Sequence, residues 1–471
     1  MVHVVVVETG ELGDRSYLAH DGHTAIVVDP QRDLDRFEAE LDARGLRAGL
    51  VVETHLHNDY VSGGLQLARR HGAPYALNAA DPVAFQRRAV GDGEELTAGG
   101  LRVRVIATPG HTDSHLAYAV TGGDGPAAVF TGGSLLYGSV GRTDLVDPAR
   151  TDELTRAQYR SAHRLADLLD DDARIFPTHG FGSFCTSGSA AGGADSTLGR
   201  ERLRNDAFTA GGEDDFVARL VAGLTAYPAY YAHMGARNRE GAGPIDLSPP
   251  VRVSPAGLRE RIAAGAWVVD LRDRTAFAAE HLAGTIGIAL GPQFATYLGW
   301  LIPWGTPLTL IGDTPRQITD AQRQLVRIGI DRPDGAAAGA LDRLAGGHPT
   351  RGYPRATFAD LAAARPPFAG PAAARAPFAD VAAARAREPR TVLDVRRDDE
   401  RVHGAIPGSV HIPLHTLLDR LDGVPAGPVW VHCASGFRAS IAASLLDRAG
   451  RDVVLIDEDY DAAVAAGLAT G

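Results

Sequence analysis

Short runs of β-branched residues alternate with longer amphipathic segments along the first half of the chain. Apolar runs bounded by turn residues predict strands, and apolar residues that repeat every three to four positions predict helices. The expected strands are residues 4–8, 24–29, 49–53, 102–106, 127–131 and 175–178, and the expected helices are 33–44 and 159–169. Both helices carry charges on their other face, which should meet solvent. This half should therefore be a layered α/β domain whose helices cover its strands.

The second half of the chain shows one order of elements twice. In the first copy, two strands at residues 267–271 and 307–311 are followed by a helix at residues 321–328. In the second copy, two strands at residues 391–395 and 428–432 are followed by a helix at residues 439–448. A helix opened by Ser254 and Pro255 precedes the first copy, and proline is favoured at the first position of a helix. We therefore expect two copies of one small α/β fold.

An Ala/Arg/Pro-rich stretch separates these copies. Within it, residues 358–365 recur almost unchanged as residues 378–385, with prolines between them. This composition is typical of a linker, from which one helix would be recruited to the last domain. The predicted domains are residues 1–240, 248–346 and 378–471, and the predicted linker is residues 347–377.

Length, charge and cysteine content narrow the class of protein. A chain of 471 residues is too long for one hydrophobic core. The net charge of -11 and the lack of a long basic run argue against a nucleic-acid partner. No apolar run approaches the ~20 residues that cross a bilayer, so no membrane association is expected. Because only Cys185 and Cys433 occur, we expect a cytoplasmic protein in a reducing compartment.

Histidines stand at the ends of three predicted strands. His55, His57 and Asp59 directly follow one strand, and alternate side chains of an extended segment point the same way. His111 and His179 follow later strands, each beside a glycine. The alternative is a set of loop histidines with unrelated structural hydrogen bonds, and a lone H-x-H motif would not exclude it. The joint pattern is more specific and predicts a metal site.

These residues resemble the signature of the metallo-β-lactamase superfamily, over most of residues 1–235. The motifs that resemble its persulfide dioxygenase branch are Thr131-Gly132-Gly133-Ser134, Gly141-Arg142-Thr143-Asp144 and His179-Gly180. The resemblance implies an αββα sandwich and one Fe2+ ion held by two histidines and one aspartate. When the family's ligand set is carried over to this chain, His55 and His111 are two of the three ligands. Gly133 stands where the family has the aspartate, and Tyr60 stands where it commonly has histidine.

Because glycine supplies no ligand, three interpretations of the first domain stay open. His57, Asp59 or a water completes an iron site. Alternatively, the metal is lost and the domain only binds a thiol carrier. In the third interpretation, His57, Asp59 and His179 support a Zn2+-dependent thioester hydrolase of the glyoxalase II type. This last interpretation is the weakest, because a two-metal site normally uses the bridging aspartate that is absent.

Two further residues of the first domain have both a functional and a structural interpretation. The family resemblance implies that the guanidinium of Arg142 pairs with a substrate carboxylate. The alternative for Arg142 is a structural ion pair with Asp144. Cys185 is expected to be a small packed residue rather than a nucleophile.

A loop in the last domain carries the clearest catalytic pattern. A strand ends before Cys433-Ala434-Ser435-Gly436-Phe437-Arg438, and a helix follows. Backbone N–H groups and a helix N-terminus stabilise a thiolate or persulfide in such a loop. Arg438 adds positive charge, and Gly436 lets the backbone turn without a Cβ clash. The loop resembles the rhodanese active site, which implies that Cys433 carries sulfane sulfur and that Ser435 and Gly436 bind the substrate. A cysteine phosphatase is the alternative, but its loop has one more residue between cysteine and arginine.

The middle domain keeps marks of the same fold, such as Asp270 and Arg272, but Asp313 takes the place of the nucleophile. It should be catalytically inactive, so the second half is expected to form two rhodanese-like three-layer α/β domains. Together these features predict iron-dependent oxidation of a thiol persulfide to sulfite, coupled to sulfur transfer by Cys433. The expected partners are a low-molecular-weight thiol persulfide, thiosulfate or sulfite, and a homodimer is one possible assembly.

Overall fold

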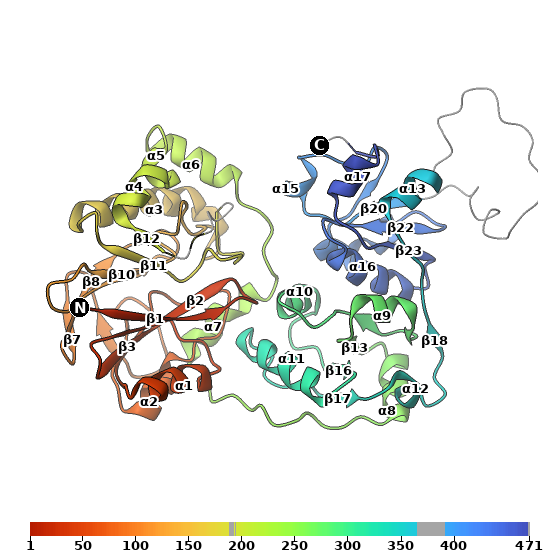
Figure 1. The fold of residues 1–471 in the computed structure, drawn as a ribbon, viewed down its shortest axis with the longest axis horizontal. Helices are drawn as coiled ribbons and strands as arrows, with labels where there is room; N and C mark the ends of the chain where they lie inside the picture. The colour runs from red at the N-terminus through yellow and green to blue at the C-terminus, as the bar shows by residue number, and fades with distance from the viewer. Residues whose placement is uncertain (188–192, 194, 365–390, 470–471) are drawn as a thin grey trace, which may run out of the picture. The chain divides into compact units, whose positions relative to one another are not determined.

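The computed structural model describes residues 1–187, 193, 195–364 and 391–469 (Figure 1). The chain divides into two compact units, Met1–Leu247 with Gln322–Arg332, and Ser248–Ala321 with Pro333–Gly471. The second copy of the repeated segment, residues 378–385, lies outside the described residues. Among the described residues, no helix combines the length and apolar character needed to cross a membrane.

Two six-stranded sheets form the centre of the first unit. The first sheet has the order β1 (His3–Thr9), β2 (Asp14–His20), β3 (Thr24–Val28), β4 (Arg47–Val52), β5 (Tyr75–Asn78) and β6 (Arg88–Val90). The second has the order β12 (Ser196–Thr197), β11 (Arg174–Pro177), β10 (Ala128–Gly132), β9 (Leu116–Thr121), β8 (Leu101–Ala107) and β7 (Glu95–Ala98). Apolar side chains from both sheets, among them Ile26, Val52, Val103 and Phe130, pack into one core.

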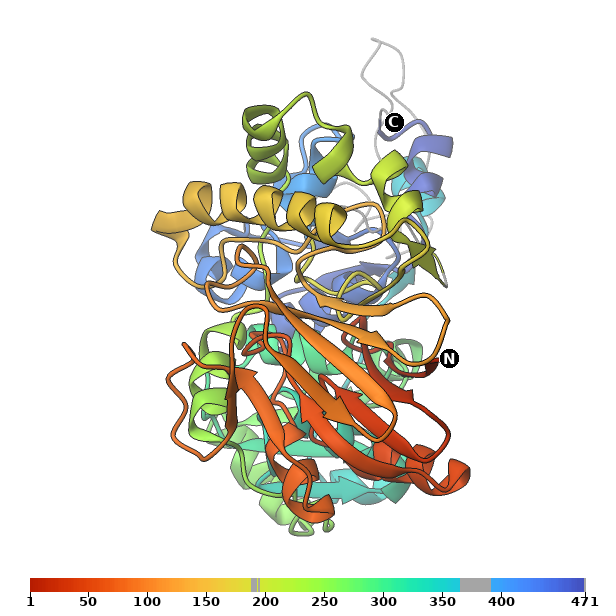
Figure 2. The same ribbon diagram turned by 90° about the vertical axis from the view of Figure 1, so that its left-hand side faces the viewer.

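Helices cover the outer faces of both sheets. Helices α1 (Asp35–Arg44) and α2 (Gly64–His71) pack on the first sheet through a core that contains Phe37 and Leu67. Helix α3 (Thr151–Leu168) lies along the outer side of the second sheet (Figure 2). The remaining helices of the unit are α4 (Leu198–Arg204), α5 (Asp206–Thr209), α6 (Glu213–Ala222), α7 (Tyr231–Glu240) and the 3-10 turn η1 (Pro148–Arg150). The predicted αββα sandwich is confirmed.

The middle part of the second unit has a four-stranded parallel sheet in the order β15 (Ile286–Gly287), β13 (Trp267–Asp270), β16 (Leu308–Gly312) and β17 (Gly335–Ala338). Its helices are α8 (Pro255–Ala263), α9 (Arg274–Ala279), α10 (Phe294–Leu301), α11 (Pro315–Arg327) and α12 (Leu341–Ala345). A separate two-stranded sheet joins β14 (His281–Leu282) and β18 (Thr350–Arg351). The end of α11 groups with the first unit rather than with the predicted domain 248–346.

The last domain repeats this strand order with one strand added at the edge. Its sheet runs β21 (Val410–His411), β20 (Thr391–Asp394), β22 (Val429–His432), β23 (Val453–Ile456) and β19 (Arg355–Ala356). Its helices are α13 (Phe358–Ala364), α15 (Asp398–Arg401), α16 (Phe437–Arg448) and α17 (Asp461–Ala465), with 3-10 turns η2 (Leu414–Thr416) and η3 (Leu418–Gly423).

The predicted linker 347–377 needs correction in its described part. Strand β19 pairs with β23, and α13 places the apolar side chains of Phe358 and Leu361 in the core of the last domain. Burial of these apolar side chains stabilises the folded domain, so the first copy of the repeated segment is part of the fold. The last domain therefore begins near residue 355.

Candidate functional site

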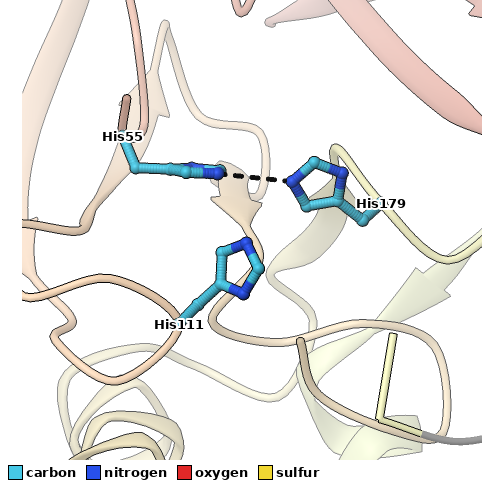
Figure 3. A group of neighbouring side chains, drawn as sticks. All are labelled: His55, His111 and His179. Carbon is cyan, nitrogen blue, oxygen red and sulfur yellow. Dashed lines mark hydrogen bonds between the residues drawn. The ribbon is translucent and has the colours of Figure 1, made fainter. Parts of the chain in front are cut away.

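Three imidazole rings meet at the ends of strands in the first unit (Figure 3). His55 follows β4, His111 follows β8 and His179 follows β11. One ring nitrogen of each lies within 4.8 Å of the others, and the Nε2 atoms of His55 and His179 are 3.3 Å apart. All three residues have at most 2% of their surface exposed. The structure thus brings together residues separated by more than a hundred positions in sequence.

The second ring nitrogen of His55 and of His111 is held by a neighbouring oxygen. The Thr54 hydroxyl donates to Asp29, so it accepts the Nδ1–H of His55 at 2.9 Å. The Nδ1–H of His111 donates to the backbone carbonyl of Arg142 at 2.6 Å. These bonds leave Nε2 as the lone-pair nitrogen, and Nε2 of His111 is buried without a hydrogen-bond partner among the described residues. Metal-bound histidines have this arrangement, in which the outer nitrogen donates to an oxygen.

Two carboxylates hold the outer nitrogen of His179. Nδ1 of His179 lies 2.9 Å from Asp14 and 3.1 Å from Asp59. Burial lowers the pKa of His179, but the Asp59 and Asp14 carboxylates outweigh burial and raise it to about 9. Burial and the nearby Asp59 raise the pKa of Asp14 to about 8, so these two acids do not both carry full charge near neutral pH. The aspartates therefore orient His179 and make its ring more basic.

His57 forms a second buried group beside the first. Its Nε2 lies 3.1 Å from Glu53, 3.4 Å from Asp29 and 2.9 Å from the Tyr60 hydroxyl. Burial lowers the pKa of His57, but Asp29 and Glu53 outweigh burial and raise it to about 10. His57 and Asp59 also lie close enough to His179 to share an ion with it, as the sequence predicted. In this structure, however, both are engaged in ion pairs.

Gly133, which replaces the expected aspartate, occupies a closely packed position. A Cβ atom there would lie 2.3 Å from Cδ2 of His111, because the imidazole ring fills that space. The N–H of Gly133 donates to Nε2 of His115 at 3.0 Å, and the side-chain amide of Gln158 donates to its carbonyl at 2.9 Å. The His115 ring stacks on that of His55 at 4.9 Å between centroids. Among the described residues, imidazoles rather than a carboxylate line the site on this side.

Sequence reasoning missed several residues of this site. Asp14 contacts a histidine 165 positions away, and nothing in its local sequence distinguishes it. His115 follows His111 by four positions, so its proximity could have been noticed. Glu53 ends the apolar run of a predicted strand, and a buried acid at a strand end is a signal that was available.

The structure contradicts the prediction that Arg142 binds substrate. Its guanidinium makes two hydrogen bonds to Asp144, at 2.7 and 2.8 Å, and two more to the carbonyls of Phe184 and Thr225. The side chain is 1% exposed. The structure therefore favours the structural alternative, and the backbone carbonyl of Arg142 holds His111. Cys185 is also buried, as predicted, and burial raises the pKa of its thiol.

The predicted catalytic loop of the last domain joins β22 to α16. The N–H of Ala439, in the first turn of α16, donates to Sγ of Cys433 at 3.3 Å. Gly436 adopts φ 83°, and a Cβ there would lie 2.3 Å from Oδ1 of Asp457. Glycine is therefore required for both its backbone conformation and its size. The loop places a sulfur atom at the positive end of a helix, which favours an anion.

Arg438 differs from the expectation of a free positive charge. Its guanidinium forms a two-point ion pair with Glu400, with one bond of 2.6 Å. The carboxylate offsets its charge, and the donor that the structure shows at Cys433 is the backbone N–H of Ala439. Ser435 is exposed at the tip of the loop and marks its solvent side.

The strand register corrects the alignment of the middle domain's sheet with the sheet of the last domain. Asp270 pairs with Ile311, and the corresponding Asp394 pairs with His432. The residue after His432 is Cys433, so its counterpart is Gly312 and not Asp313. The conclusion that the middle domain has no nucleophile at this position is unchanged, because glycine has no side chain to carry sulfur.

Comparisons with known proteins agree with both folds. The family model "Metallo-beta-lactamase superfamily" matches residues 9–179, and the model "Rhodanese-like domain" matches residues 378–466. The hydroxyacylglutathione hydrolases of Acidiphilium cryptum (strain JF-5) and Cupriavidus taiwanensis are 35% and 33% identical over 164 and 171 residues. Each match covers 34% of this chain, and 62% and 60% of the two relatives.

A solved structure extends the likeness over more of the chain. The crystal structure of a metallo-beta-lactamase from Staphylococcus aureus subsp. aureus COL is 25% identical, with a TM-score of 0.64. The alignment covers 72% of this chain and 99% of that one. The chain thus has a metallo-beta-lactamase domain at its N-terminal end and a rhodanese-like domain at its C-terminal end. Assignment of the middle domain rests on its strand order and stays a prediction.

Proposed function

We propose that this chain is an enzyme of sulfane-sulfur metabolism in which Cys433 carries sulfur as a persulfide. The observation that supports this most strongly is the contact between Sγ of Cys433 and the N–H of Ala439. A thiol at a helix N-terminus is suited to hold a thiolate and a persulfide anion, which are the two resting forms of a sulfur carrier. The first domain would act on a thiol persulfide through a metal ion.

The chemistry of Cys433 proceeds by two displacements. The thiolate attacks the sulfane sulfur of thiosulfate, a new S–S bond forms, and sulfite leaves with the electron pair of the broken bond. An acceptor thiolate or cyanide then attacks the outer sulfur and returns Cys433 to the thiolate. The Ala439 N–H and the dipole of α16 stabilise the anion at both stages. Cys433 itself is only 1% exposed, so its own sulfur atom has little contact with water.

The two cysteines of the chain provide a matched test of this step. Sulfur transfer from thiosulfate to cyanide would be measured for wild type, Cys433→Ser and Cys185→Ser. We expect transfer to be lost in Cys433→Ser and retained in Cys185→Ser, because Cys185 lies in the other unit and is packed. Full activity of Cys433→Ser would contradict the proposal.

The residues of the first domain fit a metal ion. His55, His111 and His179 present ring nitrogens within 4.8 Å, their outer nitrogens are held by oxygens, and Nε2 of His111 is buried without a partner in the described part of the chain. These three residues would hold the ion. When bound, it would act as a Lewis acid or, if it is Fe2+, activate oxygen at open positions.

For this domain we propose oxidation of a thiol persulfide. One persulfide, one O2 and one water would give one thiol, one hydrogen sulfite and one proton. The sulfite could then accept sulfur from the Cys433 persulfide to form thiosulfate. Joining both activities in one chain raises the effective concentration of the shared product. The middle domain, which has glycine at the nucleophile position, would serve docking rather than catalysis.

Metal content and oxygen uptake test this part directly. Protein purified without air would be analysed for iron and zinc, and oxygen uptake would be followed with glutathione persulfide. We expect near-stoichiometric iron and uptake that is abolished in His111→Ala. An exposed histidine, changed as His23→Ala, is the control and should behave as wild type. Protein without bound metal and without uptake would reduce the first domain to a thiol-carrier scaffold.

A second candidate is zinc-dependent hydrolysis of a thioester. It is supported by the hydroxyacylglutathione hydrolases, which match at 33–35% identity. The set of three histidines also supports it, because zinc enzymes use such a set with water in the fourth position. Hydrolysis of S-lactoylglutathione by the zinc-loaded protein, without oxygen uptake by the iron-loaded protein, would favour this candidate over oxidation.

A further inference from the structure

The carboxylate of Asp457 lies against the catalytic loop of the last domain. Asp457 directly follows β23, and its side chain is only 4% exposed. Its Oδ1 atom lies so close to Gly436 that a Cβ there would be 2.3 Å from it. The N–H of Tyr460 donates to the carbonyl of Ala434 at 2.8 Å, so the segment after β23 is bonded to the same loop. A buried acid therefore packs on the loop that is proposed to hold an anion, and like charges oppose each other.

Two arginines offset the charge of Asp457. Arg274, the first residue of α9, donates its Nε–H to Oδ1 at 2.7 Å, and the guanidinium of Arg355 on β19 lies 3.0 Å from Oδ2. Arg355 belongs to the same domain as Cys433, whereas Arg274 belongs to the middle domain. Both domains lie in the second compact unit. The middle domain thus supplies the cation that holds the carboxylate oxygen nearest Gly436.

Other charged side chains around the loop form ion pairs within the last domain. The pairs are Arg438 with Glu400 at 2.6 Å, Arg396 with Asp394 at 2.8 Å and Arg397 with Asp399 at 2.9 Å. Arg401 also reaches Asp394 at 2.9 Å. These carboxylates keep their partners when the middle domain is altered, whereas Asp457 does not.

Titratable side chains that face the loop from other elements are neutral near neutral pH. Burial lowers the pKa of His432 to about 4, and it also lowers the pKa of His415. Tyr297 on α10 places its ring 5.7 Å from that of Phe437, and burial raises the pKa of its hydroxyl. Asp459 and Asp461, which follow Asp457, are exposed, so solvent and salt screen their charges. Asp457 is therefore the buried charge on which the middle domain acts.

We propose that Arg274 is a positioning residue for sulfur transfer, supplied by the domain that has no nucleophile. It holds the Asp457 carboxylate against Gly436 and offsets its charge, so that the loop can hold a thiolate or persulfide anion at Cys433. Removing one partner of a buried ion pair leaves the other charge uncompensated, and here that charge would oppose a second anion. The inference rests on the proposed role of Cys433 and gives the middle domain a part in that role.

The midpoint pH of thiolate formation at Cys433 tests this inference without any sulfur substrate. It would be measured in the full chain by ultraviolet absorbance, as the difference between each variant and the same variant carrying Cys433→Ser. For Arg274→Gln we expect the midpoint to rise by about half a pH unit or more, because Asp457 loses a cation. Adding Asp457→Asn to this variant should return the midpoint to the wild-type value. Arg316→Gln, an 88% exposed arginine of α11 paired with Asp320, is the control and should behave as wild type.

Sulfur transfer from thiosulfate to cyanide gives a second measurement on the same variants. At a pH below the midpoint, Arg274→Gln should transfer sulfur about threefold more slowly, because a rise of half a unit lowers the thiolate fraction by that factor. Thermal unfolding confirms that each variant is folded. The inference is overturned if Arg274→Gln leaves the midpoint unchanged, or if the double variant keeps the raised value. A raised midpoint in Arg274→Gln, with no sulfur transfer by wild type, would refute the proposed function and leave the role of Arg274 at the loop standing.

Discussion

Replacing Gly133 with aspartate, which would restore the residue expected from the family pattern, should destabilise the first domain. The new Cβ would lie 2.3 Å from Cδ2 of His111, and that ring is held by its 2.6 Å bond to the Arg142 carbonyl. Overpacking a buried site costs about 1–3 kcal/mol. At this distance the ring must turn away, so a buried carbonyl loses its donor at a cost of about 1–3 kcal/mol more. We therefore expect a loss of at least about 2 kcal/mol.

This loss can be measured by thermal unfolding of the metal-free full chain. A domain of this size shifts by about 2–4 °C for each kcal/mol, so Gly133→Asp should lower its Tm by at least about 4 °C. Its metal affinity should fall as well, because His111 leaves its position. Gly10→Asp is the control, since a Cβ at Gly10 has no atom within 4 Å. Unchanged stability together with tighter metal binding would refute the interpretation of a site built from histidines.

Three further predictions follow from the same contacts. Asp59→Asn should weaken metal binding about 10–100-fold, because it removes a carboxylate from Nδ1 of His179. Competition with a coloured chelator measures this affinity, and an unchanged value would argue against a positioning role of Asp59. Metal added at about 100 times its Kd should stabilise the first domain by ~2.7 kcal/mol in a melting experiment, and His111→Ala should abolish the gain. Gly436→Ala should abolish sulfur transfer and lower the Tm, because alanine disfavours φ 83° and its Cβ would contact Asp457. A fully active variant would show that the loop is not constrained in this way.

Hydrophobic patterning predicted the fold well where strands are long and apolar. Strands β3 and β4 are almost continuous apolar runs, and both were expected. Strand β2 (Asp14–His20) begins with two charged residues, and its position was not predicted. Charged residues are tolerated there because Asp14 turns toward His179 and Arg15 pairs with Glu8 on β1. Local pattern does not reveal such tertiary compensation.

The site was predictable to the extent that its residues lie in local motifs. His55, His111 and His179 each end a recognisable strand, so their convergence could be inferred. The family position of Arg142 did not reveal its partner, because the choice between Asp144 and a ligand depends on burial. The counterpart of Cys433 was misplaced by one residue, since only strand pairing shows that Ile311 aligns with His432.

The most direct test of the central claim is peptide mass spectrometry of the full chain after incubation with thiosulfate, without reductant. The account predicts that the peptide containing Cys433 gains the mass of one sulfur atom, that the peptide containing Cys185 gains none, and that cyanide removes the addition. An unmodified Cys433, or sulfur found on Cys185 instead, would contradict the proposal that Cys433 is the sulfur carrier.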